Sequence, residues 1–542
     1  MWKLAFCGLG TLHTMAEAGG AFWEGPRYTT HYWWSAACRR QALPGESGRL
    51  PLESCMARSP IRRTKIVATL GPAWDEPGQM TALLDAGVDV VRINASHGSP
   101  EIRTRWITQL RTVLAARREA AAILFDLQGP RIRIGSLPEP IRLEPGQRVV
   151  FAPEHGAKRG EIPTTYEDLA KDVRVGARIL LDDGLLSLEV RGIREERVEA
   201  VVHYGGELKA NKGMNLPGIE VSAPALTEKD IEDVKQAVAL GVDYIALSFV
   251  RRPEDMEQLR ALVPRGVKLI AKIEKDTALK NLCGILDVSD AIMVARGDLG
   301  VELPFEEVPL IQKQIIREAS LHGKPVITAT QMLESMVHAP RPTRAETSDV
   351  ANAILDGTDA VMLSAETAVG EYPLEAVQAM DRIAREMESQ RQTRGASIDI
   401  ALGRRSAGDG ALTHNRSALS GPIRTEDAIA VAVCAAAEML SAPLIVCFTS
   451  SGFTARKVAT CRPTVPVFAC TPEPETFRQL ALVWGVTPAL TEHSTNYDTM
   501  LAVARQQILE RQLAQPGERL VVTAGVPFDM PGTTNLLKVE AV

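Results

Sequence analysis

Short runs of apolar, often β-branched residues recur along the chain from Lys65 onward, separated by longer stretches with helical spacing. Each run is mostly apolar, as expected for a parallel strand that is covered on both faces. Eight such runs are present if one long interruption is allowed: Lys65–Leu70, Val88–Ala95, Ala121–Leu127, Asp243–Val250, Lys268–Ile273, Ala291–Ala295, Pro325–Ala329 and Ala360–Ser364. Eight alternating strand and helix units predict an α/β fold, a closed (β/α)8 barrel of the TIM type.

Two further segments depart from this alternation. Residues 130–217 hold glycine-bounded alternating stretches that predict a small inserted β-barrel: Gln147–Ala152, Arg178–Leu181, Leu186–Val190 and Val198–His203. After the eighth run and a polar patch (Arg394–Pro422), strands at Leu444–Thr449, Val465–Ala469 and Leu520–Ala524 predict a separate α/β domain. We therefore expect a barrel domain (60–129 and 218–385), an inserted β-barrel domain (130–217) and a C-terminal α/β domain (386–542).

The first 55 residues have no periodic pattern. They contain four of the seven tryptophans but no aspartate. We interpret them as a non-native or disordered extension and expect the native chain to start at Met56. A short apolar stretch near the start (Leu4 to Leu12) leaves a signal peptide as the alternative.

Charge and composition exclude several classes of protein. With 61 basic and 67 acidic residues, the chain has no overall positive field for nucleic acid or an anionic membrane. No apolar run reaches the roughly 20 residues that a membrane-spanning helix needs. Eight cysteines without a C-x-x-C pair indicate a reducing, cytoplasmic location.

Polar residues follow the apolar runs where the carboxyl ends of the barrel strands meet at one rim. They are Arg92, Asn94, Ser96 and His97 after the second run, Asp126, Lys272, Glu274, Arg296, Asp298, Thr330, Ser364 and Glu366. A single Asp or Thr at such a position would be an ordinary surface or capping residue. Together, Lys272, Glu274 and Asp298 place a cation beside two carboxylates, which suits a divalent ion and a phosphate. This combination indicates phosphoryl transfer.

Several longer motifs resemble those of the pyruvate kinase family. They are K-I-V-A-T-L-G-P (65–72), R-I-N-A-S-H-G (92–98), N-K-G-M-N-L-P-G (211–218), M-V-A-R-G-D-L-G-V-E (293–302), A-T-Q-M-L-E-S-M (329–336) and P-R-P-T-R-A-E (340–346). The resemblance extends from about Arg62 to Val542 and leaves out residues 1–55. It implies transfer of a phosphoryl group from phosphoenolpyruvate to ADP, giving pyruvate and ATP in glycolysis.

The resemblance also implies roles for the residues at the rim. Glu274 and Asp298 would hold Mg²⁺ or Mn²⁺. Lys272 and Arg92 would act on the transferring phosphoryl group, and the Thr330 hydroxyl is a hypothetical general acid for the enolate. The substrate carboxylate would be bound by Thr330 and by the segment Ala295, Arg296, Gly297 and Asp298.

Other matches concern the nucleotide and a monovalent cation. Positions near the nucleotide are Pro72, Asn94, His97, Arg133 and Lys212, and the cation pocket of the family matches Asn94, Ser96, Asp126 and the backbone of Leu127. Potassium-dependent members have a glutamate at the position of Arg131 and threonines at Leu127 and Ile134. We therefore predict that K⁺ is dispensable and the pocket vacant. The alternative is that Arg131 faces solvent or a phosphate while K⁺ still binds.

Regulation and assembly are also implied. The segment Thr449, Ser450, Ser451, Gly452, Phe453 and Thr454 resembles an effector phosphate loop, although a strand-to-helix turn has the same composition. We expect a sugar monophosphate or AMP as activator and a homotetramer as the assembly.

Two other functions remain open at this point. A metal-dependent pyruvate aldolase would keep the barrel and the metal but would have no use for an inserted nucleotide lid. A catalytically silent regulator would be expected to lose the clustered charges of Lys272, Glu274 and Asp298, which are costly to bury.

Overall fold

The computed structural model describes residues 61–391, 424–528 and 532–542. The expectations for residues 1–55 and for the polar patch Arg394–Pro422 lie outside the described residues. Within those described ranges, no helix is long and apolar enough to cross a membrane.

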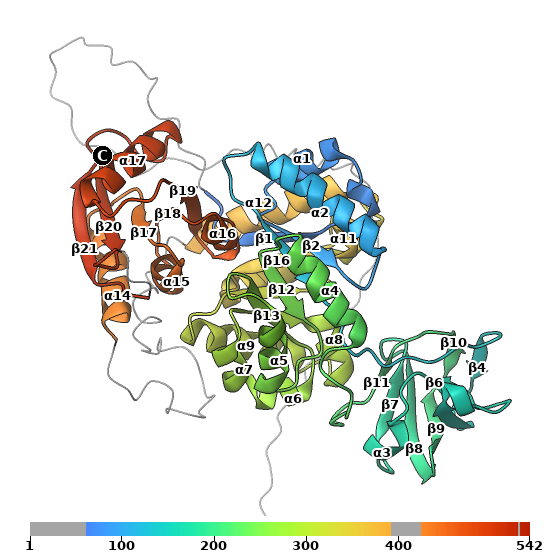
Figure 1. The fold of residues 1–542 in the computed structure, drawn as a ribbon. Helices are drawn as coiled ribbons and strands as arrows, with labels where there is room; N and C mark the ends of the chain where they lie inside the picture. The colour runs from blue at the N-terminus through green and yellow to red at the C-terminus, as the bar shows by residue number, and fades with distance from the viewer. Residues whose placement is uncertain (1–60, 392–423, 529–531) are drawn as a thin grey trace, which may run out of the picture. The chain divides into compact units, whose positions relative to one another are not determined.

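Eight parallel strands form a closed barrel, as predicted (Figure 1). The strands are β1 (Lys65–Thr69), β2 (Val90–Asn94), β3 (Ala122–Asp126), β12 (Tyr244–Leu247), β13 (Lys268–Ile273), β14 (Ala291–Ala295), β15 (Val326–Ala329) and β16 (Ala360–Leu363). They pair in the order β1-β16-β15-β14-β13-β12-β3-β2, and β2 closes the ring against β1. The register pairs Asn94 with Asp126, so the polar ends of β2 and β3 lie side by side.

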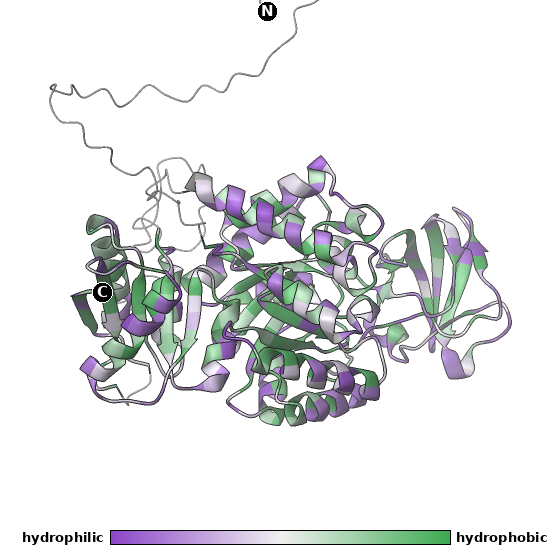
Figure 2. Cartoon of the chain, turned by 90° about the horizontal axis from the view of Figure 1, so that it is seen from above, coloured by the Kyte–Doolittle hydropathy of each residue, from purple (hydrophilic) through white to green (hydrophobic). Residues whose placement is uncertain are grey.

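Apolar side chains on both faces of these strands hold the barrel together. One cluster, including Val67, Leu124 and Met293, fills the interior, and a larger one packs between the strands and the outer helices. These helices include α1 (Pro77–Asp85), α2 (Pro100–Ala115), α4 (Glu228–Ala239), α5 (Pro253–Leu262), α7 (Leu282–Val288), α9 (Val308–Leu321), α10 (Arg344–Asp356) and α12 (Pro373–Arg391). Figure 2 shows hydrophobic residues gathered on the strands and polar residues on the outer helix faces. This two-sided burial explains why the strands read as continuous apolar runs.

The inserted segment is all β, apart from short helical turns. A six-stranded sheet pairs in the order β11-β7-β8-β9-β5-β6, and β4 (Ile141–Leu143) pairs with β10 (Gly206–Leu208) in a second sheet. The six strands are β5 (Arg148–Pro153), β6 (Ile162–Thr164), β7 (Arg178–Leu181), β8 (Leu186–Arg194), β9 (Arg197–Tyr204) and β11 (Met214–Asn215). The segment has its own apolar core, which includes Phe151, Leu188 and Val202.

The C-terminal region is a five-stranded sheet with helices. Its strands pair in the order β19-β18-β17-β20-β21, and β21 is antiparallel to β20. The strands are β17 (Ile445–Phe448), β18 (Val467–Thr471), β19 (Val486–Leu490), β20 (Arg519–Ala524) and β21 (Leu536–Ala541). The sequence predicted β17, β18 and β20 but missed β19, which contains a proline, and β21, which is partly exposed. The main helices are α14 (Thr425–Met439), α15 (Phe453–Thr460), α16 (Pro474–Gln479) and α17 (Tyr497–Glu510).

Candidate active site

Lys272 lies near the end of β13, and carboxylates from two strand ends surround it. Its Nζ donates to Ser248 Oγ at 2.8 Å and lies 2.9 Å from Glu274 Oε1 and 3.5 Å from Asp126 Oδ1. Burial alone would lower the pKa of this lysine, but the charges of Asp126 and Glu274 outweigh burial and raise it above its ordinary value. The ammonium therefore keeps its proton at neutral pH and presents a fixed positive charge.

Glu274 follows β13 directly and is 1% exposed. Its Oε2 accepts a hydrogen bond from the Phe249 amide at 2.7 Å. Burial raises the pKa of its carboxyl, Lys272 opposes this rise, and the nearby charge of Asp298 adds to it. Asp298 lies in the first turn of α8 (Arg296–Glu302), which follows β14. The charges of Lys272, Glu274 and Asp298 thus influence one another.

Arg92 lies on β2 and is held in one orientation from two neighbouring strands. Its Nε and Nη2 each lie 2.7 Å from Asp126 Oδ2, and its Nη1 donates to Thr69 Oγ1 at 3.0 Å. All three side chains are buried. Two contacts to one carboxylate and a third to a hydroxyl fix the plane of the guanidinium at the rim.

Thr330 directly follows β15 in a left-handed backbone conformation, with a φ of 69°. This conformation is unfavourable for a β-branched residue and is typical of functional sites. The Thr330 hydroxyl accepts from the Gly297 amide at 2.7 Å and donates to the Ala329 carbonyl at 2.6 Å. Arg296 donates to the Thr330 carbonyl at 2.7 Å and pairs with Asp349 at the same distance. The turn after β14 and the turn after β15 are therefore tied together.

Two buried carboxylate oxygens at this rim have no hydrogen-bond donor, namely Asp126 Oδ1 and Glu274 Oε1. Both form ion pairs with the Lys272 ammonium, whose Nζ lies 3.5 Å from Asp126 Oδ1 and 2.9 Å from Glu274 Oε1. Within the described residues, no group of three or more His, Cys, Asp or Glu side chains is arranged to hold a metal ion. A small divalent ion bound by one or two carboxylates and completed by substrate oxygens fits this donor set.

The predicted nucleotide and monovalent-cation positions lie partly on the barrel and partly in the inserted segment. Asn94 ends β2, and its Oδ1 accepts from the Ser96 amide at 3.1 Å, whereas Pro72, Ser96 and His97 are exposed. The Leu127 side chain is buried in the apolar core around the barrel and offers no oxygen.

In the inserted segment, the predicted cations pair with local groups. Lys212 Nζ lies 2.7 Å from Asp182 Oδ1, and Arg133 Nη1 donates to the Asn211 carbonyl at 3.0 Å. Burial and the neighbouring Arg131 lower the pKa of Arg133.

Arg131 itself pairs with Asp183 at 3.0 Å. Arg131 is exposed at the surface of the inserted segment, where it forms this ion pair.

The predicted effector loop connects β17 to α15. Thr449, Ser450 and Ser451 are partly exposed, and Gly452 adopts a left-handed conformation with a φ of 75° at the start of the helix. The Thr454 hydroxyl is buried and lies 2.8 Å from Thr534 Oγ1. The three partly exposed residues, rather than Thr454, are therefore available to a ligand.

Sequence reasoning missed several residues that shape the site. Thr69 at the end of β1 and Ser248 after β12 supply the hydroxyls that contact Arg92 and Lys272. With these two hydroxyls, all eight barrel strands contribute polar groups to the rim, whereas the sequence predicted polar groups at only six. Glu366 was noted only as a polar strand end, but its carboxylate accepts from the Leu333 and Ser364 amides at 3.1 and 2.6 Å. It joins the turns after β15 and β16.

Comparisons with known proteins agree with this geometry. Residues 61–377 match the family described as pyruvate kinase, barrel domain, and residues 427–540 match pyruvate kinase, alpha/beta domain. A pyruvate kinase of Geobacillus stearothermophilus is 44% identical over 489 residues, covering 89% of this chain and 80% of the relative. One from Staphylococcus saprophyticus is 43% identical over 492 residues, covering 89% and 81%.

A solved structure shows the same fold. The crystal structure of a pyruvate kinase from Cryptosporidium parvum is 34% identical, with a TM-score of 0.82 over 89% of this chain and 96% of that one. The two matched domain families, the curated relatives and the solved structure all point to the same family. The chain belongs to the pyruvate kinase family, and its enzymatic activity is that of a pyruvate kinase.

Proposed function

We propose that the rim of the barrel transfers a phosphoryl group from phosphoenolpyruvate to ADP, giving pyruvate and ATP, with Lys272 at its centre. The observation that carries this assignment is the buried Lys272 ammonium among Ser248, Glu274 and Asp126. Phosphoryl transfer needs positioned positive charge more than it needs covalent chemistry by the protein. A lysine with a raised pKa supplies that charge in every turnover without losing its proton.

Glu274 and Asp298 are the proposed ligands of Mg²⁺ or Mn²⁺. The Glu274 oxygen without a hydrogen-bond donor and the mutual influence of the two carboxylates support this assignment. The ion, when bound, would neutralise negative charge on the phosphate and carboxylate oxygens of the substrate.

Arg92 is proposed to bind the transferring phosphoryl group beside Lys272. Asp126 and Thr69 fix its guanidinium, so little orientational freedom is lost when the phosphoryl group binds. The Arg92 guanidinium and the Lys272 ammonium therefore place two positive charges at the same rim of the barrel.

Thr330 is proposed to bind the substrate carboxylate together with the backbone from Ala295 to Asp298. Its hydroxyl already lies 2.7 Å from the Gly297 amide. We also propose this hydroxyl as the general acid that protonates the enolate.

Pro72, Asn94 and His97 on the barrel are proposed to line the nucleotide site, with Arg133 and Lys212 added from the inserted segment. Closure of that segment over the rim would exclude water from the phosphoryl group. Arg133 and Lys212 would exchange their present partners, the Asn211 carbonyl and Asp182, for nucleotide phosphates.

The test of this function is pyruvate formation from phosphoenolpyruvate, ADP and Mg²⁺, coupled to lactate dehydrogenase. We expect turnover that requires both ADP and the divalent ion. A rate that is independent of ADP would contradict the proposal, and aldol cleavage without any nucleotide would favour the aldolase alternative.

Activity should not require K⁺. Leu127 is part of the apolar core, so the proposed pocket of Asn94, Ser96 and Asp126 lacks a side-chain oxygen that a hard cation would need. We propose that the Arg131 guanidinium supplies positive charge to this region in place of K⁺. Arg131 would exchange its present partner, the exposed Asp183, for the substrate phosphates.

The measurement compares turnover in buffers that contain only a bulky organic cation with turnover after K⁺ is added. We expect K⁺ to increase kcat by less than tenfold. A tenfold increase would correspond to about 1.4 kcal/mol of transition-state stabilisation by the added ion. Arg131→Glu should create a K⁺ response, whereas Arg142→Glu, an exposed charge reversal in the same inserted segment, should not. A tenfold stimulation of the wild type would overturn the prediction.

The loop of Thr449, Ser450 and Ser451 is proposed to bind the phosphate of a sugar monophosphate or AMP. We expect such an activator to lower the phosphoenolpyruvate half-saturation by roughly fivefold or more, a common size for allosteric coupling. Ser451→Asp should remove the response through charge repulsion, and Thr454→Ser should keep it, because that hydroxyl contacts Thr534. No response to any of these compounds would refute the assignment.

A homotetramer and a cytoplasmic location complete the proposal. The tetramer rests on the family, and the location rests on the glycolytic role of the family and on cysteine usage. The described cysteines, Cys283, Cys434, Cys447, Cys461 and Cys470, carry free thiols.

A further inference from the structure

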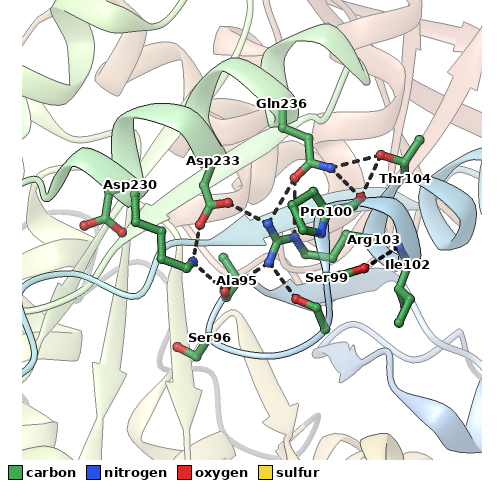
Figure 3. A network of polar contacts seen from close by, with 12 residues as sticks. Ala95, Ser96, Ser99, Pro100, Ile102, Arg103, Thr104, Asp230, Asp233 and Gln236 are labelled. Atoms are coloured by element: carbon green, nitrogen blue, oxygen red, sulfur yellow. Dashed lines mark hydrogen bonds and ion pairs between the residues drawn. The ribbon is translucent and has the colours of Figure 1, made fainter.

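Arg103 of α2 is a charged side chain that the proposed chemistry does not use, although it is only 1% exposed. Its guanidinium lies between the loop after β2 and the side chains of α4 (Figure 3). Nη1 donates to the carbonyls of Ala95 and Gly98 at 3.2 and 3.1 Å. Nη2 donates to Asp233 at 2.6 Å and to Gln236 at 3.2 Å, and Nε donates to Gln236 at 3.4 Å.

All five N–H donors of this guanidinium therefore have acceptors. Two acceptors are backbone carbonyls of the loop after β2, and the others are side-chain oxygens of α4. A planar fork of five donors can bridge these two elements at four acceptor atoms, whereas a lysine has only three donors on one atom and can satisfy fewer of them. The planar shape of the Arg103 guanidinium thus fits the positions of these acceptors, and its charge is balanced by Asp233.

The Ala95 carbonyl is held a second time. Lys229 Nζ donates to it at 2.9 Å and also pairs with Asp233 at 2.5 Å. On the other side of the residue, the Ala95 amide donates to the Asp126 carbonyl of β3 at 2.9 Å. The backbone at Ala95 is therefore fixed by the barrel on one side and by two cations on the other.

Ala95 separates Asn94 from Ser96, and His97 follows. These neighbours contact mainly one another: Asn94 Oδ1 accepts from the Ser96 amide at 3.1 Å, and the Asn94 carbonyl accepts from the His97 amide at 3.1 Å. Ser96 and His97 are exposed. The position of this loop thus depends on the anchors of Ala95 and Gly98.

Helix α4, which supplies Asp233 and Gln236, is itself well fixed at its N-terminus. Thr227 and Asp230 form a capping box at its N-terminus. Asp230 is fully buried and also accepts from the Gly129 amide at 3.1 Å, where the chain leaves the barrel for the inserted segment. An arginine bound to this helix therefore holds the loop against a rigid support.

We propose that Arg103 is a positioning residue for ADP, which holds the loop of Asn94, Ser96 and His97 in the conformation that receives the nucleotide. This inference rests on the proposed placement of Asn94 and His97 at the nucleotide site. Arg103 touches neither substrate, so its effect passes through the Ala95 and Gly98 carbonyls. Loss of these hydrogen bonds releases the loop and weakens ADP binding. The phosphoenolpyruvate site stays in place, because β13, β14 and β15 supply most of it, and Thr69 and Asp126 hold Arg92 from the neighbouring strands β1 and β3.

The test compares Arg103→Lys and Arg103→Met with Arg111→Met. Arg111 lies on the same helix and likewise contacts a carbonyl, that of Gly241, and a carboxylate, Asp243, but at the opposite end from the loop. The Arg103 variants should raise the ADP half-saturation by about tenfold or more, since misplacement of a site by about 1 Å can cost 10²-fold in rate. The phosphoenolpyruvate half-saturation should change by less than about twofold, and calorimetry should show the same loss in ADP binding.

Arg111→Met should lower the melting temperature without changing either half-saturation. A purely structural role for Arg103 would give this same pattern in its own variants and would overturn the inference. Lys229→Met, which removes only the second donor to Ala95, should raise the ADP half-saturation by a smaller factor. That variant decides the question if neither Arg103 variant folds: no rise would count against the inference.

ADP binding and pyruvate formation by the wild-type enzyme distinguish a failure of this inference from a failure of the proposed function on which it rests. If it neither binds ADP nor forms pyruvate, the proposed function fails as well. If it does both and Arg103→Lys behaves as Arg111→Met does, only the role of Arg103 is wrong.

Discussion

Lys272→Met should lower kcat by about 10³-fold or more, which corresponds to about 4 kcal/mol of lost transition-state stabilisation. The lost charge is the raised-pKa ammonium held near Ser248, Glu274 and Asp126. Because this charge acts on the phosphoryl group during transfer, phosphoenolpyruvate and ADP half-saturation should change far less than kcat does. Steady-state kinetics in the coupled assay measures both.

The variant also breaks a buried ion pair, which commonly costs about 3–5 kcal/mol of stability. Lys275→Met is the matched control, because Lys275 is largely shielded from solvent and pairs with the buried Glu302 at 2.5 Å. Both variants should lose stability, as followed by thermal melting, but only Lys272→Met should lose kcat by this factor. Equal kcat in the two folded variants would remove Lys272 from the chemistry.

Glu274→Gln should lower activity at millimolar Mg²⁺ by about 10²-fold or more. Outer-shell partners of bound metals are worth 10–100-fold in affinity or activity, and a direct ligand should be worth at least as much. The substitution keeps the shape of the side chain and removes the carboxylate whose Oε1 has no hydrogen-bond donor. The rate should recover only in part at high Mg²⁺.

A second readout does not depend on turnover. Mg²⁺ at about 100 times its dissociation constant should stabilise the wild type by about 2.7 kcal/mol, and the melting temperature should rise accordingly. Glu274→Gln should lose this rise, whereas Glu302→Gln, a buried glutamate paired with Lys275, should keep it. An unchanged Mg²⁺ response in Glu274→Gln would place the metal elsewhere.

The barrel could be predicted because its strands are buried on both faces. Burial on both sides leaves continuous apolar runs, and each of the eight runs contains a strand of the barrel whose ends lie within three residues of the ends of the run. The edge strands β19 and β21 have weaker patterns. β19 is interrupted by Pro488, and in β21 the side chains are partly exposed or exposed, so neither forms an apolar run.

The charged residues proposed for the site left a signal in the sequence, since Lys272 and Glu274 lie at the end of the otherwise apolar β13 and Asp298 lies three residues after the apolar β14. Thr69 and Ser248 were missed because a single hydroxyl at a strand end is typical of caps and turns. The Phe249 amide that donates to Glu274 has no signal in the sequence, since any residue type carries an amide.

Arg103 did leave a signal. With Trp106, Ile107 and Leu110 it follows the i, i+3, i+4, i+7 spacing of the buried face of α2, where a charged residue needs partners.

The central claim is that this rim moves a phosphoryl group from phosphoenolpyruvate to ADP and shields it from water. Phosphorus NMR of the purified protein with phosphoenolpyruvate, ADP and Mg²⁺ follows the donor, ATP and inorganic phosphate in one sample. We predict that ATP appears in equal molar amount to the phosphoenolpyruvate lost, with no matching rise of inorganic phosphate. Loss of phosphoenolpyruvate to inorganic phosphate, or no loss at all, would contradict the claim.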